Sequence, residues 1–496
     1  MAEIQLSLSV LLPILLLLYF LKLLWSRRHY PPGPLAFPII GGLWRIAFEK
    51  GIDGMTAIKA AKQYGNVFTL WLGHFPMVFL SGFDAVKEGM VDHSEELLDR
   101  GVTPFFEKIS EGKGVGFTNG HAWKQQRRLV QMALVKLGVG KRTMEDKIED
   151  EAQQLVEIFA SQQGKPFDPE LFITNAVSNV TFSLMYGYRW SVEDPNFKKL
   201  IKTIEYTLSF GLISISYILY ELFPSLMDRL PGPHKKALET SQMLLSLSKE
   251  EIRKHREQES TQEPRDFIDY YLREMEKEKN KNDPTSTVDE ENLMHSILDI
   301  YFAGLENITT VMKWALLILA NRPDVQDKII KEIEDVVGSS NICYDDHKRL
   351  PYTHAVIHEI QRYRYPMLVG IARQATRDVH MRGYIIPKGT YIAHNLRSVL
   401  LDDEYWETPH KFNPNHFLDK DGNFVARKEF LGFGTGPRSC LGENVARMEL
   451  FIFLTRLLRV FHFQPPPGVK EFTEEPARGA SLPPHPYKVC AIPRNS

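Results

Sequence analysis

Hydrophobic and polar positions divide the chain into stretches of three kinds. Residues 4–24 are apolar with Lys22 as their only charged side chain, and their length matches the ~20 residues of a bilayer-spanning helix. Two short alternating runs, NVFTLWLG and FPMVFLSG, predict a small hairpin-like sheet. From about residue 84 to residue 320, most segments repeat apolar side chains with the period of a helix. The pattern therefore predicts a mainly α protein with a small β region.

The flanks of the first apolar stretch indicate how it is used. The basic run SRRHY follows it directly, so the positive-inside rule places the bulk of the chain on the cytosolic side. An uncleaved anchor is favoured over a signal peptide, because the stretch is long and lacks both a basic leader and a small-residue cleavage site. The Pro/Gly-rich run YPPGPLAFPIIGG cannot be helical and should separate the anchor from the body. We divide the chain into an anchor (1–28), a hinge (29–42) and one large domain (43–496).

Two further stretches have a distinctive pattern. Residues 209–223, SFGLISISYILYELF, are apolar but too short to span a membrane. They form either a core helix or an interfacial segment that contacts the same bilayer as the anchor. The heavily charged residues 249–282 predict a solvated helix pair with a loop.

Charge and cysteine content exclude several classes of protein. The net charge of −2 at pH 7 gives no global basic field, so we expect no nucleic-acid partner. The cysteines, Cys343, Cys440 and Cys490, are far apart, odd in number and without a CxxC pair. They form neither a disulfide framework nor a zinc knuckle, and they fit a reducing compartment such as the cytosol.

One cysteine has a distinctive setting. The run FGTGPRSCLG, residues 433–442, places Cys440 after a glycine-rich loop and before a helical pattern that starts near Leu441. The glycines let the backbone approach a flat ligand closely. Free N–H groups and the dipole of a helix N-terminus favour an anion, so we expect a lowered pKa for the Cys440 thiol. Arg438 adds a cation that suits a carboxylate or a phosphate.

Three interpretations compete for this loop. A dinucleotide loop needs GxGxxG between a strand and a helix, whereas the glycines here follow a GxGxG spacing after no buried strand. A nucleophilic cysteine needs a histidine base, and the sequence supplies no specific one. A haem thiolate needs one deprotonated cysteine, a close glycine loop and cations for the propionates, and it uses every residue of the run.

The loop also resembles a known family. Phe433, Gly436, Arg438, Cys440 and Gly442 spell FxxGxRxCxG, which resembles the haem-ligand loop of the cytochrome P450 superfamily. The resemblance covers essentially the whole chain and points to the animal microsomal family 2 branch. It implies the cytochrome P450 fold, with Cys440 as the axial ligand of haem b.

A second motif precedes the loop by about 80 residues. Glu359 and Arg362, in EIQR, resemble the family's ExxR ion pair, which supports the fold around the haem. On the same helical run, His354 and His358 are spaced for zinc, but the run has neither HExxH order nor a third ligand. In FNPNHF, His416 stands where the family usually has arginine, as in the family 2 branch.

The resemblance assigns further haem contacts. Trp123 and Arg127, one helical turn apart, match residues that contact a propionate. Arg373 matches another propionate donor, and Ala372 stands where the family usually has a preceding proline. The complete expected set of haem-binding residues is Trp123, Arg127, Ala303, Gly304, Arg373, Phe433, Arg438, Cys440 and Gly442.

The chain departs from the family at the helix expected to cross the haem. The small side chains of Ala303 and Gly304 leave room for dioxygen, and Glu306 is the usual acid. Asn307 then replaces the threonine whose alcohol helps protonate iron-bound oxygen in the family. An amide hydrogen-bonds but does not readily ionise. We therefore expect Glu306 and Asn307 to tune proton delivery, with Thr310 as a candidate relay if the helix bulges.

The substrate pocket follows from the resemblance alone. The corresponding positions are mostly apolar and suit a lipophilic substrate. They are Phe105, Phe106, Val115, Phe210, Phe302, Met367, Ile371 and Ala480.

Together these features predict a haem-thiolate monooxygenase on the cytosolic face of the endoplasmic reticulum. It would insert oxygen into a steroid, fatty acid or xenobiotic. NADPH–cytochrome P450 reductase would supply the electrons, with cytochrome b5 as a further partner, and Lys124, Arg128 and Lys428 are candidate docking charges. Two alternatives stay open: a haem-thiolate hydroperoxide isomerase or dehydratase, and a haem-binding protein without turnover.

Overall fold

The computed structural model describes residues 11, 13–15, 17–22, 25, 27–37, 41–42, 54–73, 75–258, 263–281, 283–367, 369–477 and 481–494. The chain forms two compact units, each drawn from separate segments of the sequence. Unit 1 comprises residues 1–103, 368–402 and 434–439; unit 2 comprises residues 104–367, 403–433 and 440–496. Because the segments alternate along the chain, no single cut in the sequence separates the two units.

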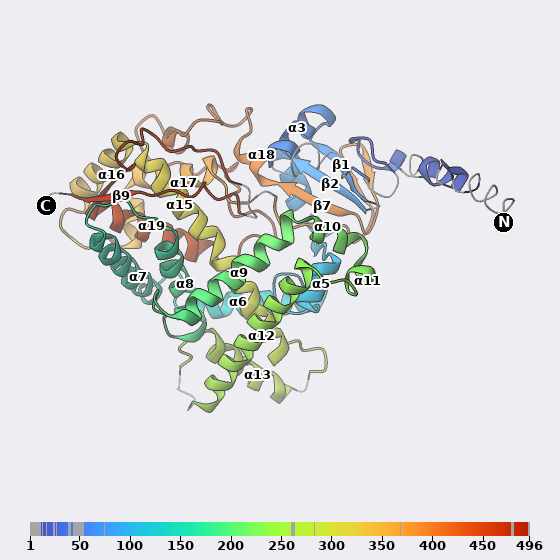
Figure 1. Cartoon of the computed structure of the whole chain (residues 1–496), viewed down its shortest axis with the longest axis horizontal. Coiled ribbons are helices and arrows are strands. Elements are labelled where there is room, and N and C mark those ends of the chain that lie inside the picture. Colours follow the sequence, from blue (N-terminus) through green and yellow to red (C-terminus); the bar gives the residue numbers. More distant parts are fainter. Residues whose placement is uncertain are drawn as a thin grey trace. The chain divides into compact units, whose positions relative to one another are not determined.

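Unit 1 holds most of the β structure. Its elements are η1 (Arg27–His29), α3 (Gly54–Tyr64), β1 (Val67–Leu72), β2 (Phe75–Ser81), α4 (Phe83–Lys87), η2 (Glu88–Asp92), β3 (Asp99–Arg100), β4 (Arg373–Gln374), β5 (Val379–Met381), β6 (Tyr384–Ile386), β7 (Tyr391–Asn395) and α18 (Leu396–Leu400). The strands form a five-stranded sheet in the order β1-β2-β7-β4-β3 and a two-stranded sheet β5-β6. β1 and β2 are antiparallel, which confirms the predicted hairpin. β2 and β7, far apart in sequence, pair in parallel (Figure 1, blue and orange).

The described part of the Pro/Gly-rich hinge packs on this sheet. Pro32 accepts the backbone N–H of Thr69 at 2.8 Å, and Pro31 accepts its hydroxyl at 2.9 Å. A side chain at Gly33 would lie 1.9 Å from the Thr69 carbonyl, so only glycine allows this approach. The segment is non-helical, as predicted, but it belongs to unit 1 and is not a free spacer.

Unit 2 is helical. Its elements are α5 (Pro104–Ser110), α6 (Gly120–Lys136), α7 (Arg142–Ser161), α8 (Glu170–Tyr186), α9 (Pro195–Ile213), α10 (Ile215–Leu222), α11 (Pro224–Met227), α12 (Pro233–Glu257), α13 (Phe267–Lys281), α14 (Glu290–Gly304), α15 (Glu306–Ala320), α16 (Pro323–Val336), η3 (Tyr344–Lys348), α17 (Pro351–Tyr363), η4 (Pro414–Phe417), α19 (Glu443–Val460), β8 (Phe461–Gln464) and β9 (Cys490–Pro493). Its core is one large hydrophobic cluster to which α7, α8, α15 and α19 contribute. The mainly α class with small sheets is confirmed.

α14 and α15 follow one another with a break at Leu305 and run through this core. Taken together, α14 and α15 (Glu290–Ala320) are the helical segment in the described part of the chain that is long and apolar enough to cross a bilayer, with a mean hydropathy of 1.3. Its apolar window is 72% buried inside the protein, as expected of a core helix. The predicted anchor at 1–28 lies mostly outside the described residues, and its described positions 13–15 and 17–22 are helical.

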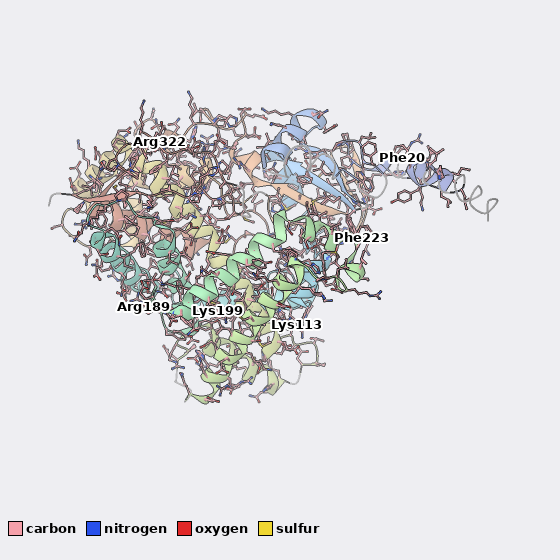
Figure 2. All side chains as sticks on the ribbon, in the orientation of Figure 1. Phe20, Lys113, Arg189, Lys199, Phe223 and Arg322 are labelled. Carbon is pink, nitrogen blue, oxygen red and sulfur yellow. The ribbon has the colours of Figure 1, made fainter. Side chains whose placement is uncertain are left out.

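The apolar stretch 209–223 does not form one helix. α9 ends at Ile213, and Ser214 starts α10 by accepting the backbone N–H of Tyr217 at 2.9 Å, as an N-cap. Phe223 follows α10 and is labelled in Figure 2. The charged run 249–282 contains the end of α12 and all of α13, as predicted.

Candidate functional site

The cysteine loop ends at the first turn of α19. The backbone N–H of Cys440 donates to the carbonyl of Phe433 at 2.9 Å, and both residues belong to unit 2. The backbone N–H groups of Gly442 and Glu443 interact with the Cys440 thiol and favour its ionised form. The helix therefore begins two residues later than predicted, and its first N–H groups face the sulfur.

The expected lowering of the Cys440 pKa is wrong for the polypeptide by itself. Burial raises the pKa of the thiol, and this effect outweighs the N–H groups of Gly442 and Glu443 and the charge of Arg127. The side chain still has an exposed surface, so a ligand can reach the sulfur although the surrounding protein desolvates it. A bound metal ion adds the positive charge that deprotonates a coordinating thiol.

Arg447, which sequence analysis missed, links the loop to two helices. Its guanidinium lies 4.8 Å from the centre of the Phe433 ring and donates to Glu443 at 2.8 and 3.0 Å. It also donates to Nε2 of His358 on α17 at 2.7 Å. The side chain of Arg447 thereby connects the start of α19, Phe433 at the beginning of the cysteine loop, and α17.

The break between α14 and α15 carries the predicted oxygen-side residues. Ala303 is exposed although most of the neighbouring helix is buried. A Cβ at Gly304 would lie 2.9 Å from Oγ1 of Thr181, so this glycine permits the close approach of α8. The Asn307 amide donates to the carbonyl of Ala303 at 3.4 Å. For Gly304 the structure therefore offers a packing role, and its contact with a haem stays a prediction.

The carboxylate of Glu306 is held by a residue that the sequence did not reveal. Ser481 donates a short hydrogen bond to Glu306 and accepts one from Thr310 Oγ1 at 3.1 Å. One turn further along α15, buried Lys313 pairs with Glu170 of α8. Sequence analysis predicted Glu306 and Thr310 but had no signal for Ser481, because it lies 171 residues beyond Thr310.

The predicted propionate donors are divided between the units. In unit 2, Trp123 is 5% exposed and Arg127 lies with Cζ 5.9 Å from its ring centre. Burial lowers the pKa of Arg127, whereas the charge of Cys440 raises it. In unit 1, Arg373 on β4 and Arg438 are both buried, and Arg438 donates to the carbonyl of Leu98 at 3.2 Å.

The ion pair predicted from EIQR is present on α17. Arg362 donates two bonds of 2.7 Å to Glu359, and both side chains are 0% exposed. His416 lies 3.1 Å from the same carboxylate, and the backbone N–H of Asn413 donates to it at 2.8 Å. Arg362 also donates to the carbonyls of Pro409 and Lys411, so both charges of the pair are satisfied by hydrogen bonds.

Part of the predicted substrate set forms an aromatic cluster in unit 2. Phe105 lies 4.9 Å from Phe210 and 5.8 Å from Phe106, measured between ring centres. Tyr217 of α10, which the sequence did not single out, lies 5.7 Å from Phe105 and 6.3 Å from Phe210. Such apolar rings suit a lipophilic ligand.

The loop before α6 is fastened to α14. The backbone N–H groups of Val115 and Gly116 each donate to Asp299 at 2.8 Å, and Lys113, labelled in Figure 2, pairs with Glu291. Among the other predicted substrate residues, Phe302 and Met367 are partly buried in unit 2, and Ile371 is exposed in unit 1. Ala480 lies outside the described residues.

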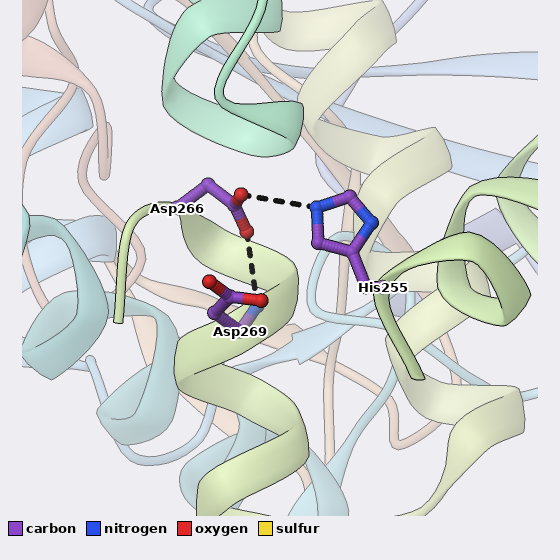
Figure 3. Close-up of side chains that lie close together, drawn as sticks. All are labelled: His255, Asp266 and Asp269. Atoms are coloured by element: carbon purple, nitrogen blue, oxygen red, sulfur yellow. Dashed lines mark hydrogen bonds and ion pairs between the residues drawn. The ribbon is translucent and has the colours of Figure 1, made fainter. Parts of the chain in front are cut away.

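Two other groups of side chains resemble metal sites. Both ring nitrogens of His358 are engaged, by the carbonyl of His354 at 2.9 Å and by Arg447, so the HxxxH pair offers no zinc ligand from His358. Figure 3 shows the other group, in which His255 contacts Asp266 at 3.0 Å and the backbone N–H of Asp269 donates to Asp266. Arg265 pairs with Asp269 at 2.7 Å. These charges are balanced without a metal ion.

The residues of unit 2 fit a haem. Cys440 offers an accessible sulfur at a helix N-terminus beside Arg127, and Ala303 offers an open helix surface without bulk. A thiolate ligand and a nearby cation are the donor set that an iron porphyrin with propionates needs.

Comparison with known proteins also indicates a haem-binding protein. A family model for cytochrome P450 matches residues 31–491. Cytochrome P450 2J5 of Mus musculus is 37% identical over 489 residues, which cover 98% of this chain and 96% of the relative. Cytochrome P450 2J2 of Homo sapiens is 39% identical, covering 94% and 92%, and cytochrome P450 2C11 of Rattus norvegicus is 40% identical, covering 97% and 95%. The chain therefore belongs to the cytochrome P450 family: it is a haem-thiolate monooxygenase that holds haem b and takes its electrons from a flavoprotein reductase.

Proposed function

We propose that this protein hydroxylates a lipophilic small molecule on the cytosolic face of the endoplasmic reticulum membrane. The reaction converts R–H, dioxygen, NADPH and a proton into R–OH, water and NADP⁺. The observation that carries this proposal is the accessible sulfur of Cys440 at the N-terminus of α19, beside the charge of Arg127. Bound haem b supplies the iron chemistry that activates dioxygen.

The proposed iron ligand and propionate donors are the residues named by the family resemblance. Cys440 is the iron ligand, and Phe433 and Gly442 flank it in the loop. Guanidinium groups and an indole N–H are suitable donors to propionates. The proposed donors are Trp123, Arg127, Arg373 and Arg438. On the side of α14, Ala303 and Gly304 border the haem.

The substrate is bound mainly by apolar contacts. Phe105, Phe106, Phe210 and Tyr217 form the aromatic part of the pocket in unit 2. The remaining lining is taken from the resemblance and consists of Val115, Phe302, Met367, Ile371 and Ala480. Because few polar side chains are among them, a steroid, fatty acid or apolar xenobiotic is the substrate class.

A second membrane contact supplements the anchor at 1–28. The exposed fractions on and after α10 are 76% for Ile215, 41% for Leu219, 44% for Phe223, 55% for Leu226 and 43% for Leu230. Large apolar side chains gathered in this way favour an interfacial position. A fluorophore on L219C in vesicle-bound protein should be quenched by lipid-linked quenchers, and one on V469C should not.

The reductase binds a mixed basic and apolar surface on α6. Lys124 and Arg128 are exposed on this helix, and Met132 and Val135 are 47% and 60% exposed. Basic side chains steer an acidic partner, and apolar neighbours stabilise the complex. Lys428, also exposed, is a separate candidate docking charge, and cytochrome b5 is a further candidate partner for the surface of α6.

The function is tested by spectrum and by turnover. The reduced carbon-monoxide complex should show the red-shifted thiolate band, and C440S should lose it. With reductase, NADPH consumption should match oxygenated product for at least one steroid, fatty acid or drug. Rapid turnover of a lipid hydroperoxide without NADPH would instead support the isomerase, which the replacement of the usual threonine by Asn307 keeps as the second candidate.

A further inference from the structure

Oxygen activation consumes protons, and Asn307 supplies no hydroxyl for that purpose. Its amide donates to the carbonyl of Ala303 at 3.4 Å, within the same helical path. An amide held in this way does not readily give up or relay a proton. Proton delivery therefore depends on other side chains near Glu306.

Ser481 brings a hydroxyl to this helix from 175 residues further along the chain. Its Oγ donates to the Glu306 carboxylate and accepts from Thr310 Oγ1 at 3.1 Å. Glu306 and Thr310 are four positions apart and so lie on one face of α15. Ser481 is 4% exposed and Thr310 2% exposed, so bulk water does not compete for these bonds.

The backbone around Ser481 is fixed by further bonds to α15. The indole N–H of Trp314 donates to the carbonyl of Leu482 at 3.0 Å, and the Tyr487 hydroxyl donates to the carbonyl of Lys313 at 2.7 Å. Leu482 has a φ of 44°, in the left-handed region that is unfavourable for a bulky residue. Such a conformation persists only where the surrounding structure holds it, as the bonds from Trp314 and Tyr487 to this segment and to α15 do here.

We propose that Ser481 is a positioning residue for proton transfer: with Thr310 behind it, its hydroxyl holds the Glu306 carboxylate in one orientation and so replaces the alcohol that Asn307 lacks. This inference rests on the proposed function. With haem bound, the Glu306 carboxylate would take up a proton from water and pass it towards the oxygen that is being reduced. Only protons move in this step, so the electrons supplied by NADPH remain balanced.

Glu205 is a second carboxyl group whose charge interacts with that of Glu306. Glu205 of α9 has an exposed surface. Partial burial, followed by the charges of Glu306 and Glu170, raises the pKa of Glu205 to about 7. The charges of Lys313 and Lys202 act in the opposite direction and lower this pKa. A carboxyl group that titrates near neutral pH exchanges protons readily with water. The charges of Glu205 and Glu306 therefore interact, and a change at Glu306 should also alter the pKa of Glu205.

The test compares hydroxyl-free and hydroxyl-bearing variants of the holoenzyme with its reductase. S481A should lower the product formed per NADPH about tenfold or more, with peroxide released instead. S481T keeps a hydroxyl and should retain most of the coupling. The matched control S296A removes a buried serine hydroxyl that has no hydrogen-bond partner among the described residues of the chain. Its coupling should stay within about twofold of the wild type.

A more specific test restores a threonine hydroxyl at position 307, where the family usually has one. N307T should recover most of the coupling lost in S481A, because it returns a hydroxyl to the usual position. The coupling of N307T alone is measured as the reference for this recovery. A loss in S481A that N307T does not recover, or equal losses in S481T and S481A, would overturn the inference.

Infrared spectroscopy gives a readout that is independent of turnover. The difference between wild-type and S481A resting holoenzyme should contain a shifted carboxylate band, and the same comparison in an E306Q background should lack it. Absence of the shift would rule out the positioning role. A wild-type protein without the carbon-monoxide thiolate band would refute the proposed function. A normal band with unchanged coupling in S481A would refute only the present inference.

Discussion

The cysteine region and the Glu306 region of unit 2 are built in opposite ways. In the cysteine region (Phe433 and residues 440–449), most bonds join near neighbours, such as Cys440 with Phe433 and Arg447 with Glu443. In the Glu306 region (residues 303–313 and 481–487), the key bonds join Ser481 to residues 171 and 175 positions away. A short motif can therefore fix the cysteine region, whereas the Glu306 region needs the whole fold to bring its groups together.

The largest effect is expected where the cysteine region is supported from α17. E359A leaves the guanidinium of Arg362, 0% exposed, without its carboxylate, and removes the acceptor for the backbone of Asn413. Breaking one side of a buried ion pair costs about 3–5 kcal/mol. The free energy of unfolding in urea should fall by this amount, and haem should be lost at lower urea concentration.

The exposed pair Arg253–Glu257 of α12 is the control. R253A removes a surface pair that water screens, so it should leave unfolding and haem retention unchanged. Equal effects of E359A and R253A would show that the buried pair does not support the cysteine region.

The second effect tests the link from Phe433 to α17. R447M removes the hydrogen bonds to Glu443 and His358 and the charge over the Phe433 ring. Hydrogen bonds to charged groups contribute about 1.5–3 kcal/mol, so unfolding should become easier by that range. Because Phe433 accepts the N–H of Cys440, the carbon-monoxide band should also shift.

R456M is the matched control on the same helix. Arg456 pairs with Glu149 of α7 at 3.1 Å, away from the cysteine loop in sequence, so its loss should change stability without moving the band. If R447M lowers stability but leaves the band in place, Arg447 is a structural residue alone.

These contrasts explain what the sequence could predict. The hairpin β1–β2 and the charged helices α12 and α13 follow from local patterns, and so does the ion pair of Glu359 and Arg362, which are three residues apart. The helical order of unit 2 follows from the apolar period and the length of each run.

Other features depend on contacts that no local pattern encodes. Ser481 and Asp299 act on residues more than 170 positions away, and the packing of Gly304 against Thr181 needs the path of α8. The pKa of Cys440 was mispredicted because the helix N-terminus is visible in the sequence, whereas the degree of burial is not. Desolvation and long-range bonds are thus the parts of a site that motif reasoning misses.

The third prediction concerns the effect of burial on stability in the cysteine region, measured through the pH dependence that Glu449 causes. Burial alone raises the pKa of Glu449 on α19 well above its usual value. The folded state therefore binds a proton that the unfolded state releases above roughly pH 4.3. Stability from this group is present below that pH and falls as the pH rises towards the folded pKa.

E449Q removes this dependence because the amide does not titrate. The wild type should lose about 1.4 kcal/mol of unfolding free energy for a one-unit rise in pH within this window, relative to E449Q. Urea unfolding at two pH values measures the difference. Parallel pH profiles of the two proteins would mean that Glu449 is ionised in the fold.

The smallest effect compares one glycine from each region. G304A places a Cβ 2.9 Å from Thr181 Oγ1, so α8 or the Thr181 side chain must shift, at about 1 kcal/mol. In G442A the new Cβ meets no protein atom within 4 Å, and the backbone φ of −92° suits alanine, so the free energy of unfolding should change by less than about 0.5 kcal/mol.

Haem retention by G304A and G442A then distinguishes the two positions. If G442A releases haem at unchanged polypeptide stability, the space beside Gly442 is needed by the ligand and the contact taken from the family is supported. If G304A releases haem and G442A does not, the close approach belongs to the Glu306 region instead.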